Sequence, residues 1–200
     1  DALARRLVDV RIGAEVTAVE RHEDGVDVRT SAGVQRFDHV VVATHADQAL
    51  ALLVDASPEE KADLAAIEYS RNPTWLHRDA SLLPRSRRAR ASWNYRLDSC
   101  RGGDSKVVVS YSMNRLQGLD DTEEHIVTLN ATHRVDPDTV TARMTYSHPI
   151  FTAEAVAAAA RLRSAGGPRL AFAGAHLGWG FHEDGCRSGV EAAARFGATW

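Results

Sequence analysis

The segment from Leu170 to Phe196 constrains the fold more than any other part of this chain. It reads LAFAGAHLGWGFHEDGCRSGVEAAARF: a short apolar run, a glycine-rich loop, and a helix-like stretch expected to start near Gly185. A strand that leads through such a turn into a helix brings backbone N–H groups up to a negatively charged ligand. Asp184 is placed to cap the helix, and its carboxylate can also accept from a sugar hydroxyl. The segment predicts an anion-binding turn; a strand–helix connection without a ligand is the alternative.

Length and charge narrow the remaining choices. The 200 residues, 44% hydrophobic and 26% charged, suffice for one domain or two small lobes of a soluble globular protein. A formal net charge of −3 gives no reason to expect nucleic-acid binding. The local cluster of Arg85, Arg87, Arg88 and Arg90 indicates either a solvated loop or a contact with phosphate or anionic lipid. No apolar run approaches the roughly 20 residues that a membrane-spanning helix needs.

The cysteines and histidines predict neither a disulfide framework nor a metal site. Cys100 and Cys186 are the only cysteines and form no CxxC pattern, which favours a reducing, cytoplasmic location. His176, His182 and Glu183 follow no standard zinc spacing, so we expect no metal.

Alternating apolar runs predict a three-stranded antiparallel meander near the N-terminus. The first run starts at Val16 and the second at Val26, and the third extends from Phe37 through Val42. Turns that contain glycine separate the runs, as in β-hairpins. The stretch Ser57-Pro58-Glu59-Glu60 then predicts a helix start with a capping box.

The middle of the chain has a different character. From Trp75 to Tyr146, aromatic and β-branched runs recur between turns, which predicts a mostly antiparallel sheet. Thr152 is expected to cap an alanine-rich helix, after which Leu170 returns the chain to the first lobe. Four residues at alternating positions predict either the wall of an apolar cavity or the buried face of a sheet: Trp93, Tyr95, Tyr111 and Met113.

We therefore predict an α/β (α+β) fold with two lobes. The first lobe is discontinuous and comprises residues 1–56 and 168–200, with the meander and the glycine-rich turn. The second lobe comprises residues 57–167 and carries the mixed or antiparallel sheet.

Several stretches together resemble flavin-containing amine-oxidase-like proteins, and most closely a bacterial branch of NAD/FAD-binding oxidoreductases. They include EVTAVERHEDGVDVRT, DHVVVATHADQALALL, SYSMNRLQGL and the GWGFHEDG–RSG stretch. The resemblance implies FAD as cofactor, a partial Rossmann-like FAD-binding lobe at 1–56 and 168–200, and a substrate-binding lobe at 57–167. In this family the adenine end of the flavin sits on an N-terminal GxGxxG turn, which is missing here. We therefore expect the chain to be the C-terminal portion of a longer flavoprotein that binds FAD weakly by itself.

The resemblance also implies which residues contact FAD. Gly185 and Cys186 would lie nearest the pyrimidine edge, and Glu183 or Asp184 would contact the ribityl–phosphate part. Gly189 would let the helix pack close to the ligand or the strand. The whole predicted cofactor set is Val16, Thr44, Gly174, Gly180, Phe181, His182, Glu183, Asp184, Gly185, Cys186 and Gly189.

Three points qualify this set. Val16 would contact adenine through its backbone, or be a plain strand residue. Thr44 would lie near the ADP half, or cap the helix that follows it. No catalytic residue is assigned.

The implied function is an FAD-dependent oxidoreductase that acts on a small-molecule or lipid substrate, either a lipid acyl chain or an amine. Family association suggests contact with a peripheral membrane surface or a methyltransferase. The alternative is a non-catalytic lipid- or partner-binding module that retains the flavoprotein fold.

Overall fold

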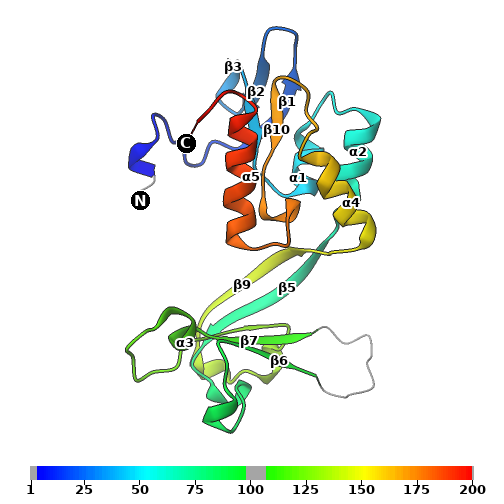
Figure 1. The fold of residues 1–200 in the computed structure, drawn as a ribbon. Helices are drawn as coiled ribbons and strands as arrows, with labels where there is room; N and C mark the ends of the chain where they lie inside the picture. The colour runs from blue at the N-terminus through cyan, green and yellow to red at the C-terminus, as the bar shows by residue number, and fades with distance from the viewer. Residues whose placement is uncertain (1–3, 98–106, 200) are drawn as a thin grey trace. The chain divides into compact units, whose positions relative to one another are not determined.

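The computed structural model describes residues 4–97 and 107–199, so Cys100 lies outside the described residues. The chain divides into two compact units, unit 1 with residues 1–69 and 149–200 and unit 2 with residues 70–148. Helices and several sheets combine in a mixed α/β fold, as predicted (Figure 1).

The elements of unit 1 are η1 (Ala4–Arg6), β1 (Val16–Arg21), β2 (Val26–Thr30), β3 (Gly33–Phe37), β4 (Val40–Val42), α1 (Ala46–Leu52), α2 (Pro58–Ala65), α4 (Ala153–Leu162), β10 (Leu170–Phe172), η6 (Ala175–Leu177) and α5 (His182–Ala194). The elements between α2 and α4 are β5 (Tyr69–His77), η2 (Ala80–Leu82), η3 (Arg87–Ala89), β6 (Trp93–Arg96), β7 (Val108–Ser112), α3 (Met113–Gln117), β8 (Ile126–Leu129), η4 (Thr132–Arg134), η5 (Pro137–Thr139) and β9 (Val140–Pro149).

Unit 1 contains two separate sheets. Strands β1, β2 and β3 form the predicted antiparallel meander. Strand β4 is not part of it: β4 pairs in parallel with β10, with Val40 opposite Leu170 and Val42 opposite Phe172. The prediction of a third meander strand running through Val42 was therefore wrong. An apolar run such as 40–42 suits a parallel pair, although only Val42 is buried and Val41 is 39% exposed. The partner strand lies near the other end of the chain.

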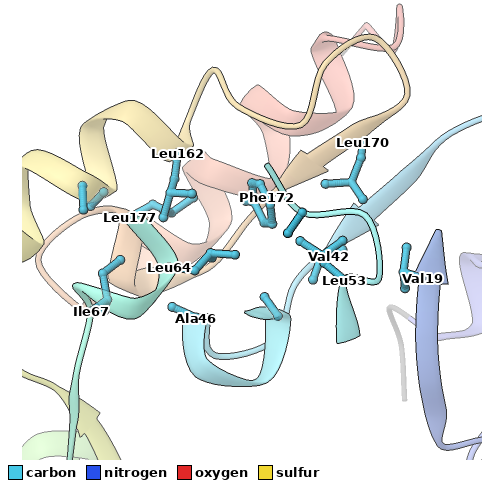
Figure 2. Close-up of a cluster of buried hydrophobic side chains, with 14 of the residues drawn as sticks. Val19, Val42, Ala46, Leu53, Leu64, Ile67, Leu162, Leu170, Phe172 and Leu177 are labelled. Carbon is cyan, nitrogen blue, oxygen red and sulfur yellow. The ribbon is translucent and has the colours of Figure 1, made fainter. Parts of the chain in front are cut away.

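The core of unit 1 lies on one face of the β4–β10 pair (Figure 2). Leu64 of α2, Leu162 of α4 and Phe172 of β10 meet there, each at most 3% exposed. On the other face, α5 packs along β10 through Ala171 and Ala192 (Figure 1). Burying a leucine or phenylalanine contributes roughly 1.5–3 kcal/mol, so these contacts hold the helices against the strands.

The borders of the units differ from the predicted lobe borders at residues 57 and 167. Helices α2 and α4 belong to unit 1, because their apolar sides enter its core. Both helices start as predicted. Ser57 Oγ accepts from the Glu60 N–H at 3.2 Å, and the Glu60 carboxylate accepts from the Ser57 N–H at 2.9 Å. Thr152 Oγ1 accepts from the Ala155 N–H at 3.0 Å.

Unit 2 is built on a five-stranded sheet in the order β6-β7-β8-β5-β9, with antiparallel pairing from β6 to β5. One face is covered and carries buried polar groups. The Asp79 N–H donates to His77 Nδ1, so Nε2 carries the proton and donates to Thr128 Oγ1 at 2.8 Å. Thr128 in turn lies 2.8 Å from Ser110 Oγ. Burial lowers the pKa of His77, which matches a neutral imidazole held by this chain of hydrogen bonds.

Candidate functional site

The candidate site of unit 1 lies where β4 and β10 end. The two strands are parallel, so their carboxyl ends meet at one edge of the sheet. Thr44 follows β4, and the turn from Gly174 to Phe181 follows β10 and leads into α5. In open α/β sheets, ligands bind at such carboxyl ends. The structure thus brings most of the predicted cofactor residues to one edge.

Val16 is placed differently. It starts β1 in the meander and lines a pocket of about 370 Å³ together with Val28 and Phe37. No residue of the glycine-rich turn lines this pocket. Its contact with adenine stays a prediction.

Helix α5 begins at His182, three residues before the predicted start at Gly185. Phe181 is the N-cap residue, and the Gly185 N–H already donates to the Phe181 carbonyl at 3.2 Å. The open donors of the first turn are therefore the N–H groups of His182, Glu183 and Asp184, which donate to no acceptor among the described residues. These three groups carry the positive end of the helix dipole.

Asp184 fastens the turn to the helix instead of capping the helix as predicted. It occupies the third helical position, and its Oδ2 accepts from the backbone N–H groups of Trp179 and Phe181 at 3.0 and 3.1 Å. Its Oδ1 accepts from Arg187 Nη2 at 2.7 Å. The hydrogen bond from the Phe181 N–H is the main cause that lowers the pKa of Asp184 below its usual range. A side chain at Gly178 would overlap this carboxylate, which explains the glycine there.

Ser188 of α5 forms a second set of hydrogen bonds between the helix and the turn, which the sequence analysis did not predict. Its Oγ accepts from the Gly174 N–H at 2.9 Å and donates to the Gly185 carbonyl at 2.8 Å. The Gly174 N–H is therefore not available to a ligand. The sequence could have indicated the bond from Ser188 to the Gly185 carbonyl, because a serine within a helix often donates to a backbone carbonyl of the preceding turn.

Gly180 and Gly189 have different surroundings. Gly180 has φ +85°, a left-handed conformation that favours glycine, and a Cβ there would lie 3.3 Å from the Phe151 ring. A Cβ at Gly189 would meet no described atom within 4 Å. The prediction that Gly189 allows close packing of α5 on the strand was therefore wrong; its approach to a ligand stays a prediction.

The start of α5 carries an exposed aromatic surface. Trp179 is 63% exposed and Phe181 69%, and the Trp179 ring lies 5.9 Å from the Phe151 ring. The side chains of His182, Glu183 and Cys186 are also exposed. Beside Trp179, a pocket of about 430 Å³ is lined by Val156, Ala160 and Leu177 among others. Large apolar side chains exposed together often mark a binding surface.

His45 and Tyr69 form the contacts of the segment between β4 and α1. His45, not Thr44, is the N-cap residue of α1, and the Ala46 N–H donates to the Tyr69 hydroxyl at 2.9 Å. Thr44 Oγ1 donates to the His45 carbonyl at 3.2 Å, so the alternative that Thr44 caps α1 was wrong.

Burial, with His45 nearby, lowers the pKa of His176 to about 4, so its imidazole is neutral at pH 7. Across residues 4–97 and 107–199, no group of three or more His, Cys, Asp or Glu could hold a metal ion.

Unit 2 offers a separate apolar surface. Trp93 on β6 lies opposite Tyr111 on β7, which lies opposite Val127 on β8. Next to this row, Tyr95 lies opposite Val109, so these side chains share one face of the sheet. The residues of β7 and β8 on this face are half-buried. Met113 begins α3 and does not continue the strand.

The parallel strand pair, the tight turn and the open helix start are features shared by α/β proteins that bind an anionic nucleotide cofactor at the carboxyl edge of the sheet. The residues fit an FAD in part. Three N–H donors and two exposed rings are open to it, whereas the N–H groups of Gly174 and Gly185 are occupied.

Comparison with known proteins makes the class specific. The family model described as "flavin containing amine oxidoreductase" matches residues 1–196, so the chain belongs to that family. The family description agrees with the predicted flavin cofactor. A search of curated proteins finds no significant match.

Solved structures share the fold. A fatty acid isomerase from P. acnes that produces CLA superimposes with a TM-score of 0.61 at 17% identity, over 92% of this chain and 48% of its own. Cyclohexylamine oxidase from Brevibacterium oxydans superimposes with a TM-score of 0.58 at 17% identity, over the same two shares. A candidate protoporphyrinogen oxidase from Exiguobacterium sp. has a TM-score of 0.58 at 13% identity, over 94% and 48%. The chain thus spans about half the length of these proteins.

Proposed function

We propose that the chain forms part of an FAD-dependent oxidoreductase in which the start of α5 contacts the cofactor. The open first turn of α5 carries the proposal. The free N–H groups of His182 and Glu183 can donate to an anionic or carbonyl oxygen, and the exposed rings of Trp179 and Phe181 can cover a flat ring. Bound FAD supplies the hydride-accepting chemistry, while these residues orient it and exclude water.

Polypeptide outside residues 1–200 would supply the remaining cofactor contacts. The N–H groups of Gly174 and Gly185 already donate to Ser188 Oγ and the Phe181 carbonyl, which leaves few donors for a whole dinucleotide. We expect the chain alone to bind FAD with a dissociation constant weaker than about 1 μM, measured by flavin fluorescence titration. The full-length product of the gene should purify with the visible absorbance of a flavin. A folded full-length product that neither carries nor takes up flavin would refute the oxidoreductase proposal.

Gly189→Ala tests whether the cofactor approaches α5 along its open side. The added methyl group meets no described protein atom, so the chain should gain up to about 1 kcal/mol in unfolding free energy from better helix propensity. The FAD affinity of the full-length product should fall, because the methyl group occupies the approach. Ala194→Val, near the far end of the same helix, should leave FAD affinity unchanged. Equal FAD affinity in the Gly189→Ala and native proteins contradicts this placement of the cofactor.

The half-buried apolar face of unit 2 is the proposed substrate surface. Its central residues Val109, Tyr111, Val127 and Leu129 carry no charge, which favours an acyl chain over an amine. The structural relatives include both a fatty acid isomerase and a cyclohexylamine oxidase, so the choice of an acyl chain rests on the uncharged face alone.

A fluorescent fatty acid tests this assignment. Val127→Asp places a charge in the middle of the face and should reduce binding of the probe at least tenfold. The matched control Val34→Asp makes the same change on the exposed strand β3 and should have no effect. Circular dichroism checks that both variants are folded. Equal binding by the two variants contradicts a substrate surface on this face.

A further inference from the structure

The arginines of a short basic and aromatic segment of unit 2, which borders the proposed substrate face, have no role in the proposed reaction. Residues 85–97 contain η3 and the edge strand β6. The segment holds arginines at 85, 87, 88, 90 and 96, and no Asp or Glu occurs from residue 80 to 97. This local excess of positive charge contrasts with the net charge of −3 for the chain.

Three of these arginines lack a carboxylate partner among the described residues. Arg90 donates to Glu124 at 3.0 Å, but Arg85, Arg87 and Arg88 are exposed and form no ion pair within 4–97 and 107–199. Elsewhere arginines are commonly paired, as in Arg21 with Glu60 and Arg161 with Asp63. An exposed arginine without a partner keeps its charge available to an external anion.

The nearest acidic groups do not cancel this charge. A cleft of about 280 Å³ brings Arg87 near Asp121, Glu123 and Glu124. Each carboxylate already has a hydrogen-bonding partner of its own: Asp121 has His125 at 2.8 Å, and Glu123 has Arg78 at 3.1 Å. Glu124 is taken by Arg90. The arginine cluster therefore remains positive.

Apolar side chains stand next to the cluster. Trp93, Tyr95 and Leu97 occupy alternate positions and are 53%, 48% and 60% exposed. The Trp93 and Tyr95 rings lie 6.0 Å apart. Arg85 and Tyr95 line one pocket of about 360 Å³, which joins the arginines to the aromatic residues. An edge strand with exposed apolar side chains is a liability unless something covers it.

We propose that residues 85–97 dock onto the surface of an anionic phospholipid membrane. The arginines would bind lipid phosphates, and Trp93, Tyr95 and Leu97 would enter the headgroup region, where aromatic and aliphatic side chains are stable. A lipid surface uses both halves of the segment, whereas a nucleic acid would leave Leu97 in water. None of the described helices has the length and apolar character to cross a bilayer. The proposal is independent of the flavin site.

Co-sedimentation of the chain with phosphatidylcholine vesicles, with and without phosphatidylglycerol, tests the proposal. We expect binding only to the phosphatidylglycerol vesicles, and weaker binding at high salt. Arg85→Glu/Arg88→Glu should lower the partition coefficient by at least about tenfold, because each arginine near an anionic surface contributes roughly 1 kcal/mol. Arg5→Glu/Arg6→Glu makes the same change of charge on exposed arginines of unit 1 and should bind almost as the native chain does.

The aromatic residues give a second readout. Trp93→Ala/Tyr95→Ala should weaken binding and remove a blue shift of tryptophan fluorescence that accompanies it. Circular dichroism checks that all variants are folded. Three outcomes overturn the proposal: no binding to anionic vesicles, an equal loss in both arginine variants, or displacement of the chain from vesicles by RNA at equal phosphate concentration.

Discussion

Acid should destabilise unit 1 through one buried histidine. His176 lies at the end of β10 and is 8% exposed, and burial lowers its pKa from 6.5 to about 4. Between these two pH values the unfolded chain binds a proton that the folded chain does not, so lowering the pH favours unfolding. The stabilising contribution is complete above pH 6.5 and is lost as the pH falls towards 4.

The size of the effect comes from the difference between the pKa of His176 in the folded chain and in the unfolded chain. Each factor of ten in proton affinity corresponds to about 1.36 kcal/mol, so this difference costs about 3 kcal/mol in the acid limit and about 2.5 kcal/mol between pH 7.5 and 4.5. The measurement is urea unfolding followed by circular dichroism at both pH values. Other groups, including the neutral His77, also contribute to the change. A variant that removes only His176 is therefore needed.

His176→Leu keeps a side chain of similar volume and cannot titrate. The native chain should lose about 2.5 kcal/mol more than this variant between pH 7.5 and 4.5. His133→Gln, on an exposed residue of unit 2, should keep the native pH dependence. If the native chain and His176→Leu lose the same free energy, the imidazole is not held neutral by burial and the reasoning fails.

Other substitutions test the packing and the turn. Leu162→Ala empties a fully buried position and should lower the unfolding free energy by about 3 kcal/mol in urea titrations. Thr152→Ala removes the N-cap of α4 and should cost about 1 kcal/mol by the same assay. Asp184→Asn should speed amide hydrogen exchange at Trp179 and Phe181, whose N–H groups donate to this carboxylate; unchanged exchange contradicts the fastening role.

Features set by neighbouring residues were predictable from the sequence. The capping box at Ser57 and the cap at Thr152 each depend on residues three positions apart, and both were confirmed. The meander was predictable because short turns join its strands. Strand β4 was assigned to the wrong sheet because its partner β10 is remote in the sequence. The borders of the compact units differ from the predicted lobe borders for a similar reason, since only tertiary packing shows that α2 and α4 belong to unit 1.

The start of α5 shows a subtler difficulty. An Asp before an apolar helix pattern is typical of an N-cap, because an N-cap carboxylate accepts from N–H groups that follow it. Asp184 instead accepts from Trp179 and Phe181, which precede it. A side chain at the third helical position that accepts from the N-cap N–H forms one half of a capping box, so Asp184 fits a helix that starts at His182. The predicted helix start was therefore three residues late.

Contacts within the chain explain some of the glycines near the candidate site and leave one unexplained. Gly178 makes room for the Asp184 carboxylate, Gly174 makes room for the His176 ring, and Gly180 supplies a left-handed conformation. These three are explained by the chain itself and say nothing about a ligand. Gly189 differs: within a helix it costs about 1 kcal/mol relative to alanine, and no described atom approaches it. No contact among the described residues explains Gly189, and its open side of α5 is where the cofactor is proposed to lie.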